Sequence, residues 1–496
     1  MTKKKKTFRP KARVPRGFRD RFGADLAAER EMLERISTVY EQFGFDPLET
    51  SAFEYTDALG KFLPDVDRPN AGVFSLQDDD EQWMSLRYDL TAPLARYVAE
   101  HFDALPKPFR RYATGPVWRN EKPGPGRFRQ FTQCDADTVG APAPHADVEC
   151  VVMLAEALSS SGLARDKFTI RINDRNVLTG LLETIGVSEE DPRKLTILRA
   201  LDKLDRLGPD GVRLLLGEGR KDESGDYTEG AKLPDGAIEK VMAFTQATGA
   251  TNAATVDALS NLVSGTEIGD KGVGTLGQMA EQLAQLGCDE TTALIDLSVV
   301  RGLEYYTGAV FEAELNFDVE DDKGRPVRFG SVAAGGRYDG LVKRFKGVEV
   351  PAVGVSIGVS RLRAALELTA AGGYQSVSGP VVVLALEPDR MGAYQQMAAD
   401  LRNAGVRAEV YLGGSGMRAQ MKYADKRGAP IAIIQGEDER QKSVVTIKDL
   451  VLGAKLSGEI SDNAEWREGQ PAQFETPRDN LVAAVKETLA RSSDGA

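Results

Sequence analysis

The stretch from Phe109 to Gly140 constrains the fold of this chain more than any other, because it specifies an antiparallel hairpin. A strand pattern at 110–119 is followed by a loop rich in Gly and Pro at 120–126 and a second strand pattern at 127–133. This order predicts two paired strands joined by a wide tip. Arginine offers a rigid fork of donors that suits phosphate, so the hairpin indicates either a polyphosphate site or a solvated sheet edge. Its arginines are Arg110, Arg111, Arg119, Arg127 and Arg129.

The order of residues around the loop resembles a known motif. Arg119-Asn120-Glu121, the loop, and Gly126-Arg127-Phe128-Arg129-Gln130-Phe131 are similar to motif 2 of the class II aminoacyl-tRNA synthetases, in the form typical of the histidyl-tRNA synthetase family. The resemblance implies that Arg119, Glu121 and Arg127 bind ATP. It also places Lys122 and Gly124 in a loop that contacts the tRNA acceptor end.

The loop departs from the family in one respect. In the family this loop often reads Arg-Pro-Gln and contacts the extra 5′ guanosine of tRNA(His), whereas this chain reads Lys122-Pro123-Gly124-Pro125. We therefore hypothesise that the acceptor end is recognised without that guanosine.

The composition of the chain limits its number of domains, its cellular location and the kinds of chemistry that it can carry out. A chain of 496 residues with 42% hydrophobic residues suits a globular protein of roughly two to four domains. It has no apolar run long enough for a bilayer and no signal-peptide pattern, and its three cysteines indicate a reducing compartment, so a cytoplasmic location and no membrane contact are expected. Two histidines and the absence of a CxxC pair argue against Ser-His-Asp hydrolysis and against a protein metal site.

The first part of the chain predicts a basic arm and then a helix. Residues 1–21 are rich in Lys and Arg and form either a solvated tail or a tRNA-contacting arm. Apolar residues at helical spacing predict a helix over 25–43, and a strand follows at 45–53. This helix and strand resemble motif 1, which builds the dimer interface in the family, although Ser51 replaces the usual proline. The resemblance implies a homodimer.

Several segments resemble the amino-acid site of the family. Arg87-Tyr88-Asp89-Leu90-Thr91 is similar to a segment whose acid and threonine bind the substrate amino group, which gives Asp89 and Thr91 that role. A carboxylate suits an ammonium group because charge-assisted hydrogen bonds are strong. Gln133 and Asp137 match a second pair of residues associated with amino-acid binding.

The segment Arg301-Gly302-Leu303-Glu304-Tyr305-Tyr306 is the most specific signal in the chain. An arginine and two tyrosines supply a fixed cation and two aromatic walls, which suit an imidazole substrate. The resemblance implies that Arg301 contacts the reacting carboxylate and α-phosphate and that both tyrosines line the histidine pocket, with Glu304 as an acceptor for an imidazole N–H. The segment 334–341 is also typical of the family and adds Tyr338 to the histidine site.

Two further regions complete the catalytic half. Residues 351–362 resemble motif 3, a strand that leads into a helix, with Arg361 as an ATP-binding arginine and Ser360 where the family usually has Glu. Residues from about 175 to 290 show short helical patterns and Gly-rich breaks. We interpret them as a helical insertion that is either a lid or a holder of the tRNA acceptor stem.

The C-terminal part predicts a separate domain. A linker composition at 372–379 precedes alternating strand and helix patterns over 380–470, which predict a small, mostly parallel sheet. This module resembles the anticodon-binding domain of the family, and its second helix is basic, as either a solvated face or an RNA contact. Residues 471–496 are predicted to form a tail that ends in a helix.

The motifs together predict an α+β fold: a class II catalytic domain over 22–371, with an antiparallel sheet and a helical insertion, followed by the α/β domain. The implied reaction is ATP-dependent ligation of histidine to tRNA(His) through histidyl-adenylate, with Mg²⁺ bound alongside ATP. One alternative is a non-catalytic paralogue, such as a regulatory subunit of ATP phosphoribosyltransferase, but such paralogues typically lack the second domain and lose motif arginines. Another is a prolyl- or threonyl-tRNA synthetase, against which the Arg301–Tyr306 segment argues.

Overall fold

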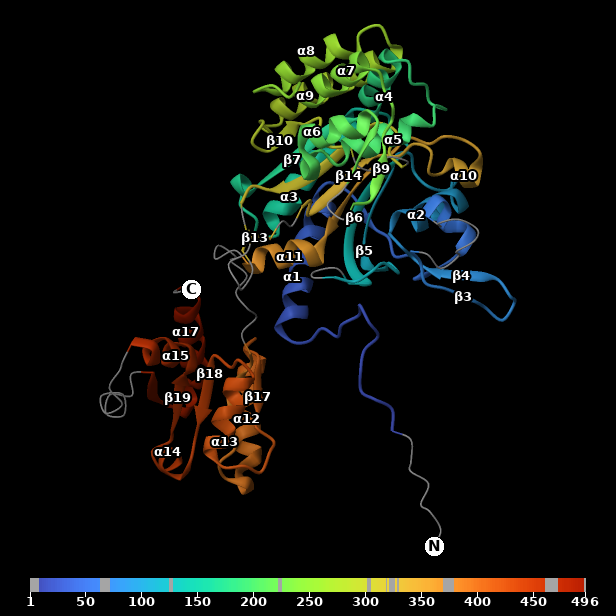
Figure 1. The fold of residues 1–496 in the computed structure, drawn as a ribbon. Helices are drawn as coiled ribbons and strands as arrows, with labels where there is room; N and C mark the ends of the chain where they lie inside the picture. Colours follow the sequence, from blue (N-terminus) through green and yellow to red (C-terminus); the bar gives the residue numbers. More distant parts are fainter. Residues whose placement is uncertain are drawn as a thin grey trace. The chain divides into compact units, whose positions relative to one another are not determined.

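The computed structural model describes residues 9–62, 72–124, 128–221, 225–300, 305–317, 319–320, 326–327, 330–368, 379–459 and 472–494. The chain divides into two compact units, of which the larger holds residues 1–21 and 29–373 and the smaller holds residues 22–28 and 374–496 (Figure 1). Each unit has its own sheet and its own hydrophobic core.

The larger unit is built on an eight-stranded sheet whose interior pairs are all antiparallel. Only the edge pairs, β1 with β5 and β10 with β7, are parallel. In spatial order the strands are β1 (Asp46–Pro47), β5 (Phe109–Trp118), β6 (Gln130–Val139), β15 (Ala352–Gly358), β14 (Ala333–Arg337), β11 (Ala309–Leu315), β7 (Phe168–Asp174) and β10 (Ala293–Ile295). This sheet confirms the predicted α+β class and the predicted hairpin, although its second strand runs further than the sequence pattern indicated.

Helices cover this sheet because each has one apolar face. α1 (Ala24–Gln42) buries Met32, Ile36 and Tyr40, which recur at helical spacing. α3 (His145–Ser160) packs against β15, and α11 (Val359–Leu368) follows β15 directly and packs against β6 and β15. The predictions of a helix over 25–43 and of a strand leading into a helix at 351–362 are confirmed.

One predicted strand is wrong in extent. The pattern at 45–53 is split between β1 and β2 (Phe53–Tyr55), which belong to different sheets. The chain leaves one sheet there and joins another, and such a change is decided by tertiary pairing rather than by local propensity.

A three-stranded antiparallel sheet lies beside the helix that begins at Thr91. β2 pairs with β4 (Trp83–Leu86), which pairs with β3 (Ser75–Gln77). α2 (Thr91–Glu100) follows, and its Arg96 forms an ion pair with Glu54 of β2 at 2.7 Å.

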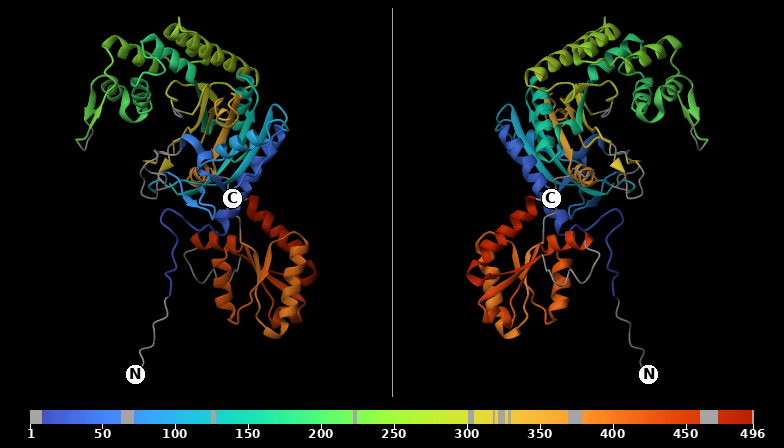
Figure 2. Two further views of the ribbon diagram at one scale, coloured as in Figure 1. Left: turned by 90° about the vertical axis from the view of Figure 1, so that its right-hand side faces the viewer. Right: turned by 90° about the vertical axis from the view of Figure 1, so that its left-hand side faces the viewer.

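The region between β7 and β10 is mainly helical. α4 (Arg175–Thr184), α8 (Asn252–Val263) and α9 (Glu267–Gln285) pack on one another (Figures 1 and 2). A Cβ at Gly180 would lie 2.4 Å from the Cα of Gly269, so these glycines let α4 and α9 cross closely. The remaining elements are α5 (Arg193–Leu201), α6 (Leu204–Leu216), β8 (Gly219–Lys221), β9 (Tyr227–Glu229) and α7 (Asp235–Thr245).

The junction between β7 and α4 contains a buried aspartate whose ionisation makes the stability of the fold depend on pH. Asp174 caps α4 by accepting from the Asn176 backbone N–H at 2.7 Å, and burial raises the pKa of its carboxyl to about 7. The folded protein therefore binds a proton that the unfolded chain releases, and stability falls as pH rises between about 4 and 7.

We expect Asp174→Asn to keep the cap and to remove this pH dependence, because asparagine caps helices as well as aspartate does. Between about pH 5.5 and 7 the wild type should lose about 2 kcal/mol of unfolding free energy relative to the variant. Urea unfolding of both proteins across this range measures the difference. Parallel curves would contradict the assignment.

The smaller unit contains a five-stranded mixed sheet in the order β17 (Ala408–Val410), β16 (Val381–Val383), β18 (Ile431–Ile434), β19 (Val444–Asp449) and β20 (Gln473–Pro477). The first three strands are parallel, and β19 and β20 join antiparallel. α12 (Met391–Asn403) and α17 (Leu481–Asp494) pack on the core of this sheet, and α13 (Met417–Lys426), α14 (Glu437–Gln441) and α15 (Leu450–Glu459) complete the unit. The described part of the predicted tail thus ends in a helix as expected, α17, which joins the core, and it also supplies the strand β20, which was not predicted.

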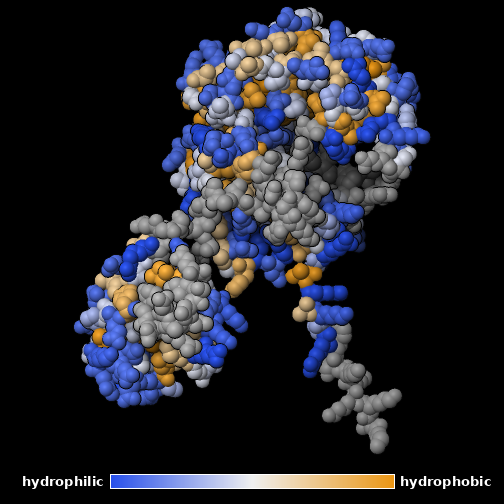
Figure 3. Space-filling view, turned by 60° about the vertical axis from the view of Figure 1, so that its left-hand side comes forward, coloured by the Kyte–Doolittle hydropathy of each residue, from blue (hydrophilic) through white to orange (hydrophobic). Residues whose placement is uncertain are grey.

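The described surface in the view of Figure 3 is mostly hydrophilic, with apolar residues in small scattered groups. None of the helices in the described part of the chain combines the length and hydropathy needed to cross a bilayer.

Candidate active site

Strand β6 presents a row of polar side chains to one face of the large sheet. Side chains two residues apart share a face of a strand, so Gln133, Asp135 and Asp137 lie in line. The residues of β15 paired with them are all small: Gly358, Ser356 and Gly354. A Cβ at Gly354 would lie 2.0 Å from Oδ1 of Asp137, so glycine is needed there. The small residues leave space above the centre of the sheet.

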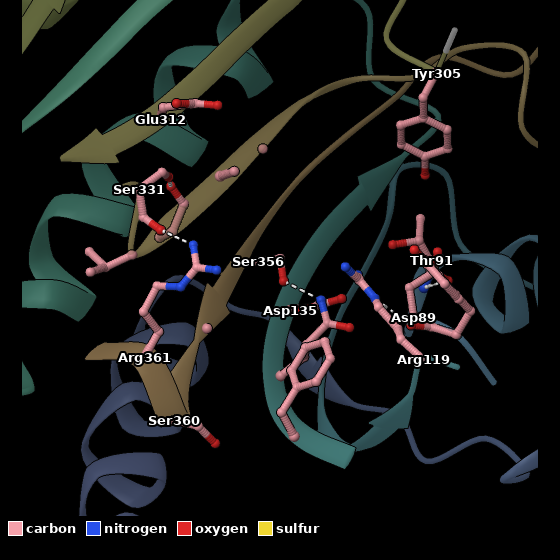
Figure 4. A pocket seen from close by; sticks show the side chains of 18 of the residues that line it. Asp89, Thr91, Arg119, Asp135, Tyr305, Glu312, Ser331, Ser356, Ser360 and Arg361 are labelled. Atoms are coloured by element: carbon pink, nitrogen blue, oxygen red, sulfur yellow. Dashed lines mark hydrogen bonds between the residues drawn. The ribbon is translucent and has the colours of Figure 1, made fainter. Parts of the chain in front are cut away.

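A cavity of about 480 Å³ occupies this space. The residues predicted for binding that line it are Asp89, Thr91, Arg119, Glu121, Lys122, Gln133, Tyr305, Tyr306 and Arg361. In Figure 4 the labelled groups divide into an end with Asp89, Thr91 and Tyr305, an opposite end with Ser331 and Arg361, and a middle with Asp135, Ser356 and Arg119. Segments far apart in the sequence therefore converge on one site.

Arg119 is held by aromatic rings rather than by an acid. Its guanidinium carbon lies 4.3 Å from the centre of the Tyr88 ring and 5.1 Å from that of Phe131. Nε donates to the backbone carbonyl of Tyr88 at 3.4 Å. No carboxylate among the described residues forms an ion pair with it, so its terminal N–H groups suit an anionic ligand.

Asp89 is fixed by the start of α2. Its Oδ1 accepts from the backbone N–H groups of Thr91 and Ala92 at 3.1 and 2.9 Å. These two backbone N–H groups hold the Asp89 carboxylate in one orientation. The carboxylate beside the Thr91 hydroxyl forms a suitable acceptor pair for an ammonium group.

The opposite end of the cavity carries Arg361, at the start of α11. Its Nη1 donates to the backbone carbonyl of Ser331 at 2.8 Å. A second guanidinium, at the end of the cavity opposite Asp89 and Thr91, suits the outer phosphates of a nucleotide. Ser360, which stands where the family usually has Glu, also lines the cavity.

Two of the predicted histidine-binding residues lie behind the cavity wall. Asp137 forms an ion pair with the buried Arg111 at 2.7 Å and accepts a hydrogen bond from the hydroxyl of Tyr338. Neither Asp137 nor Tyr338 is part of the lining, but the Tyr338 ring stacks on that of Tyr305, with ring centres 5.4 Å apart. Gly124 is described and lies outside the lining, and Arg127, Arg301 and Glu304 fall outside the described residues.

Other lining residues were not predicted, chiefly Tyr88, Asp135, Glu312 and Ser356. Asp135 had a signal in the sequence, since it falls between Gln133 and Asp137 on the same face of a strand. Burial, together with the negative charge of Asp137, raises the pKa of Asp135 to about 7. Glu312 reaches the site only because β11 pairs with β14, which in turn pairs with β15 in the sheet.

Glu121 and Glu312 are the glutamates in this lining. Carboxylate oxygens are the ligands that Mg²⁺ prefers, usually in small number and together with substrate phosphates. Among the described residues no group of three or more His, Cys, Asp or Glu side chains is arranged to hold a metal by itself. The donor set therefore fits a metal ion that is shared with a nucleotide.

An antiparallel sheet whose β5–β6 hairpin and β15–α11 unit enclose such a cavity defines the catalytic domain of a class II aminoacyl-tRNA synthetase. The sequence profile of histidyl-tRNA synthetase matches residues 17–362, and that of the anticodon-binding domain matches residues 380–488. The chain belongs to the histidyl-tRNA synthetase family.

Individual relatives agree with the profiles. The chain is 59% identical over 488 residues to the histidine–tRNA ligase of Brucella ovis, covering 98% of this chain and 97% of that protein. It is 56% identical over 484 residues to that of Caulobacter vibrioides, covering 97% of both. The crystal structure of histidyl-tRNA synthetase from a Nostoc species superposes with a TM-score of 0.75 at 28% identity, covering 97% of this chain and 100% of that one.

Proposed function

We propose that this protein ligates L-histidine to tRNA(His) with ATP, through a histidyl-adenylate. The observation that carries the proposal is the position of Arg119 between an ammonium-binding end and an arginine-bearing end of one cavity. A histidine whose ammonium lies at Asp89 and Thr91, with Gln133 beside it, directs its carboxylate toward Arg119. An ATP whose outer phosphates lie at Arg361 presents its α-phosphate to the same guanidinium.

The chemistry is mostly positioning and electrostatic stabilisation. A carboxylate oxygen attacks the α-phosphorus as the bond to pyrophosphate breaks, and a terminal tRNA hydroxyl then attacks the carbonyl carbon and releases AMP. Arg119 faces the charge that develops on the phosphoryl oxygens, and Arg301 is assigned to the same charge by resemblance. Arg127 is assigned by resemblance, with Arg361, to the outer phosphates. Mg²⁺, held by Glu121 or Glu312 with the phosphates, would neutralise the leaving group.

ATP–pyrophosphate exchange with each standard amino acid tests the proposal. We expect exchange with histidine alone and its loss in Arg301→Ala, because the carboxylate would lose a fixed cation. Histidine binding without exchange for any amino acid would overturn the proposal and indicate a regulatory paralogue instead.

The hairpin tip is proposed to contact the tRNA acceptor end through Lys122 and the backbone at Gly124. Because the glutamine of the usual loop is absent, we expect tRNA(His) transcripts with and without the extra 5′ guanosine to be charged with kcat/KM values within about threefold. Aminoacylation of the two transcripts measures this, with a tRNA lacking the histidine anticodon as a negative control. A loss of about 100-fold on removal of the guanosine would contradict it.

A homodimer is proposed from the sheet β2–β4–β3. On this sheet the usual alternation is inverted, since the buried face carries the polar Glu54, Ser75 and Ser85. The opposite face exposes Phe53 and Tyr55, at 38% and 56% of their surface, next to Leu76. Exposed apolar faces of this kind mark interfaces, and we propose a second copy as the partner.

Phe53→Ser combined with Tyr55→Lys is expected to weaken the dimer at least about 100-fold, because apolar contacts are lost and a charge is introduced at the interface. Sedimentation or light scattering across a dilution series measures the dissociation constant. Leu412→Lys, at an exposed apolar residue of the smaller unit, is the control. A dimer that survives the double substitution would exclude this face.

We also propose that the protein is cytoplasmic and that its domains meet at residues 21, 371, 380 and 470. The basic N-terminal arm is proposed as a separate segment, and the insertion over about 175–290 is proposed to hold the acceptor stem.

A further inference from the structure

The end of the N-terminal arm packs against the β5–β6 hairpin. Residues 15–18 form a turn that is closed by a backbone hydrogen bond of 3.1 Å between its first carbonyl and its last N–H. Gly17 stands third in this turn with φ 86°, a conformation that glycine adopts readily and other residues do not. A Cβ there would also lie 2.9 Å from Cγ of Arg129 and 3.2 Å from Cβ of Pro123. Gly17 therefore touches both the tip of the hairpin and the strand that follows it.

Backbone hydrogen bonds join this turn to the hairpin. The N–H of Arg129 donates to the carbonyl of Gly17 at 2.8 Å, and the carbonyl of Arg129 accepts from the N–H of Arg119 at 2.9 Å. Nε of Arg129 donates to the carbonyl of Glu121 at 3.0 Å. Arg119 and Glu121 both line the active-site cavity. Arg129 thus connects the turn of the arm to the part of the hairpin that forms the cavity wall.

Two side chains of the arm contact aromatic rings. The ring of Phe18 packs on that of Phe74, with ring centres 5.8 Å apart. The guanidinium carbon of Arg19 lies 4.1 Å from the centre of the Phe128 ring, and Phe128 lines the cavity. A guanidinium over an aromatic face is attracted to the ring, so this contact restrains Phe128.

We propose that Gly17 and Arg19 position the part of the hairpin that binds ATP. Gly17 holds the backbone of Arg129, and Arg19 holds the ring of Phe128. Neither Gly17 nor Arg19 is part of the cavity lining, so both act through the residues that they contact. The inference rests on the proposed function and adds a role for the end of the N-terminal arm.

These contacts predict an effect on ATP rather than on histidine. Arg119 and Glu121, which Arg129 joins to the turn, are assigned to ATP. Asp89, assigned to the ammonium group of histidine, is fixed by the start of α2 instead. Loss of the turn should therefore weaken the binding of ATP and leave that of histidine nearly unchanged.

Arg19→Ala tests the contact with Phe128. We expect the KM for ATP in ATP–pyrophosphate exchange to rise about three- to fivefold, while the KM for histidine stays within about 1.5-fold and Tm does not change. Arg19→Lys should restore most of the loss, because an ammonium group is also attracted to an aromatic face. Arg16→Ala is the matched control, since Arg16 is an exposed arginine of the same turn and contacts no ring among the described residues.

Gly17→Ala tests the backbone contact. The added Cβ meets Arg129 and strains a residue with positive φ, so we expect the KM for ATP to rise at least about tenfold. Gly23→Ala is the matched control, because Gly23 also has positive φ, at 65°, but nothing lies within 4 Å of its Cβ position. Amide hydrogen exchange at residues 128–131 should become faster in Gly17→Ala and not in Gly23→Ala.

A KM for ATP that is unchanged in both Arg19→Ala and Gly17→Ala would overturn the proposal. Equal losses for ATP and histidine with a lowered Tm would overturn it too, because they indicate general support of the fold. A wild-type protein that supports no exchange with any amino acid would refute the synthetase function separately. ATP binding measured by calorimetry would then replace the KM, and unchanged binding together with unchanged amide exchange would refute the positioning role.

Discussion

Arg119→Ala is expected to lower kcat/KM for histidyl-adenylate formation by about 1000-fold. The guanidinium is held between the rings of Tyr88 and Phe131 and faces a cavity with no ion-pair partner from the described residues. Its position therefore requires no reorganisation when charge develops on the α-phosphate, which is the condition under which such groups contribute most to rate. The measurement is ATP–pyrophosphate exchange at varied histidine and ATP.

Arg119→Lys should recover only part of this loss, since an ammonium keeps the charge but not the planar fork or its stacking. Arg110→Ala is the control, because Arg110 lies on the same hairpin and pairs with Glu149 outside the cavity. It should retain kcat/KM within about twofold. If Arg119→Ala loses less than about tenfold, the phosphate contact assigned to this arginine is wrong.

Arg111→Met is expected to destabilise the larger unit by about 3–5 kcal/mol. The side chain of Arg111 is 1% exposed, and it pairs with Asp137 at 2.7 Å and donates to the backbone carbonyl of Leu90 at 2.9 Å. Its removal leaves the buried carboxylates of Asp137 and Asp135 without a cation. Urea unfolding, followed through the transition of the larger unit, gives the free-energy difference.

Two comparisons isolate the buried pair. Arg110→Met removes a half-exposed ion pair one residue away and should cost less than about 1 kcal/mol. Adding Asp137→Asn to Arg111→Met removes the unpaired charge and keeps an acceptor for Tyr338, so a substantial part of the lost stability should return. Equal effects of Arg110→Met and Arg111→Met would contradict the importance of burial.

The pH dependence of the Arg111 effect follows from the same contacts. Burial already raises the pKa of Asp137, and Arg111 opposes that shift. Without Arg111 the folded state should hold protons on these acids to higher pH. The deficit of Arg111→Met should therefore be smaller near pH 5.5 than near pH 7.5, by about 1 kcal/mol or more.

Local patterns predicted most single elements of the fold. The apolar spacing of α1, the turn residues between β5 and β6, and the strand that leads into α11 are properties of neighbouring residues, and they recur in the structure within a few positions. The errors fall where the chain changes sheets, from β1 to β2, and at β20, which completes the sheet of the smaller unit. Pairing partners decide those segments.

In the candidate site, too, some residues follow from short motifs and others depend on the pairing of distant strands. Arg119, Asp89, Thr91 and Arg361 belong to short motifs, and each lines the cavity. Asp137 and Asp135 have the same side chain on the same strand face, and the sequence favoured the first. Arg111, paired across the hairpin with Asp137, and Tyr338, brought by β14, engage Asp137 and leave Asp135 to face the cavity.

Side-chain chemistry at short spacing was sufficient to predict the family, the α+β class and the motif residues. The assembly of the strands places the Asp137 carboxylate in a buried ion pair and the Asp135 side chain in the lining of the cavity, and it turns the apolar face of the β2–β4–β3 sheet outward. Both outcomes depend on contacts between segments up to about 200 residues apart. Burial, hydrogen bonding and charge pairing at such separations are set by how the strands assemble rather than by the residues of any one strand.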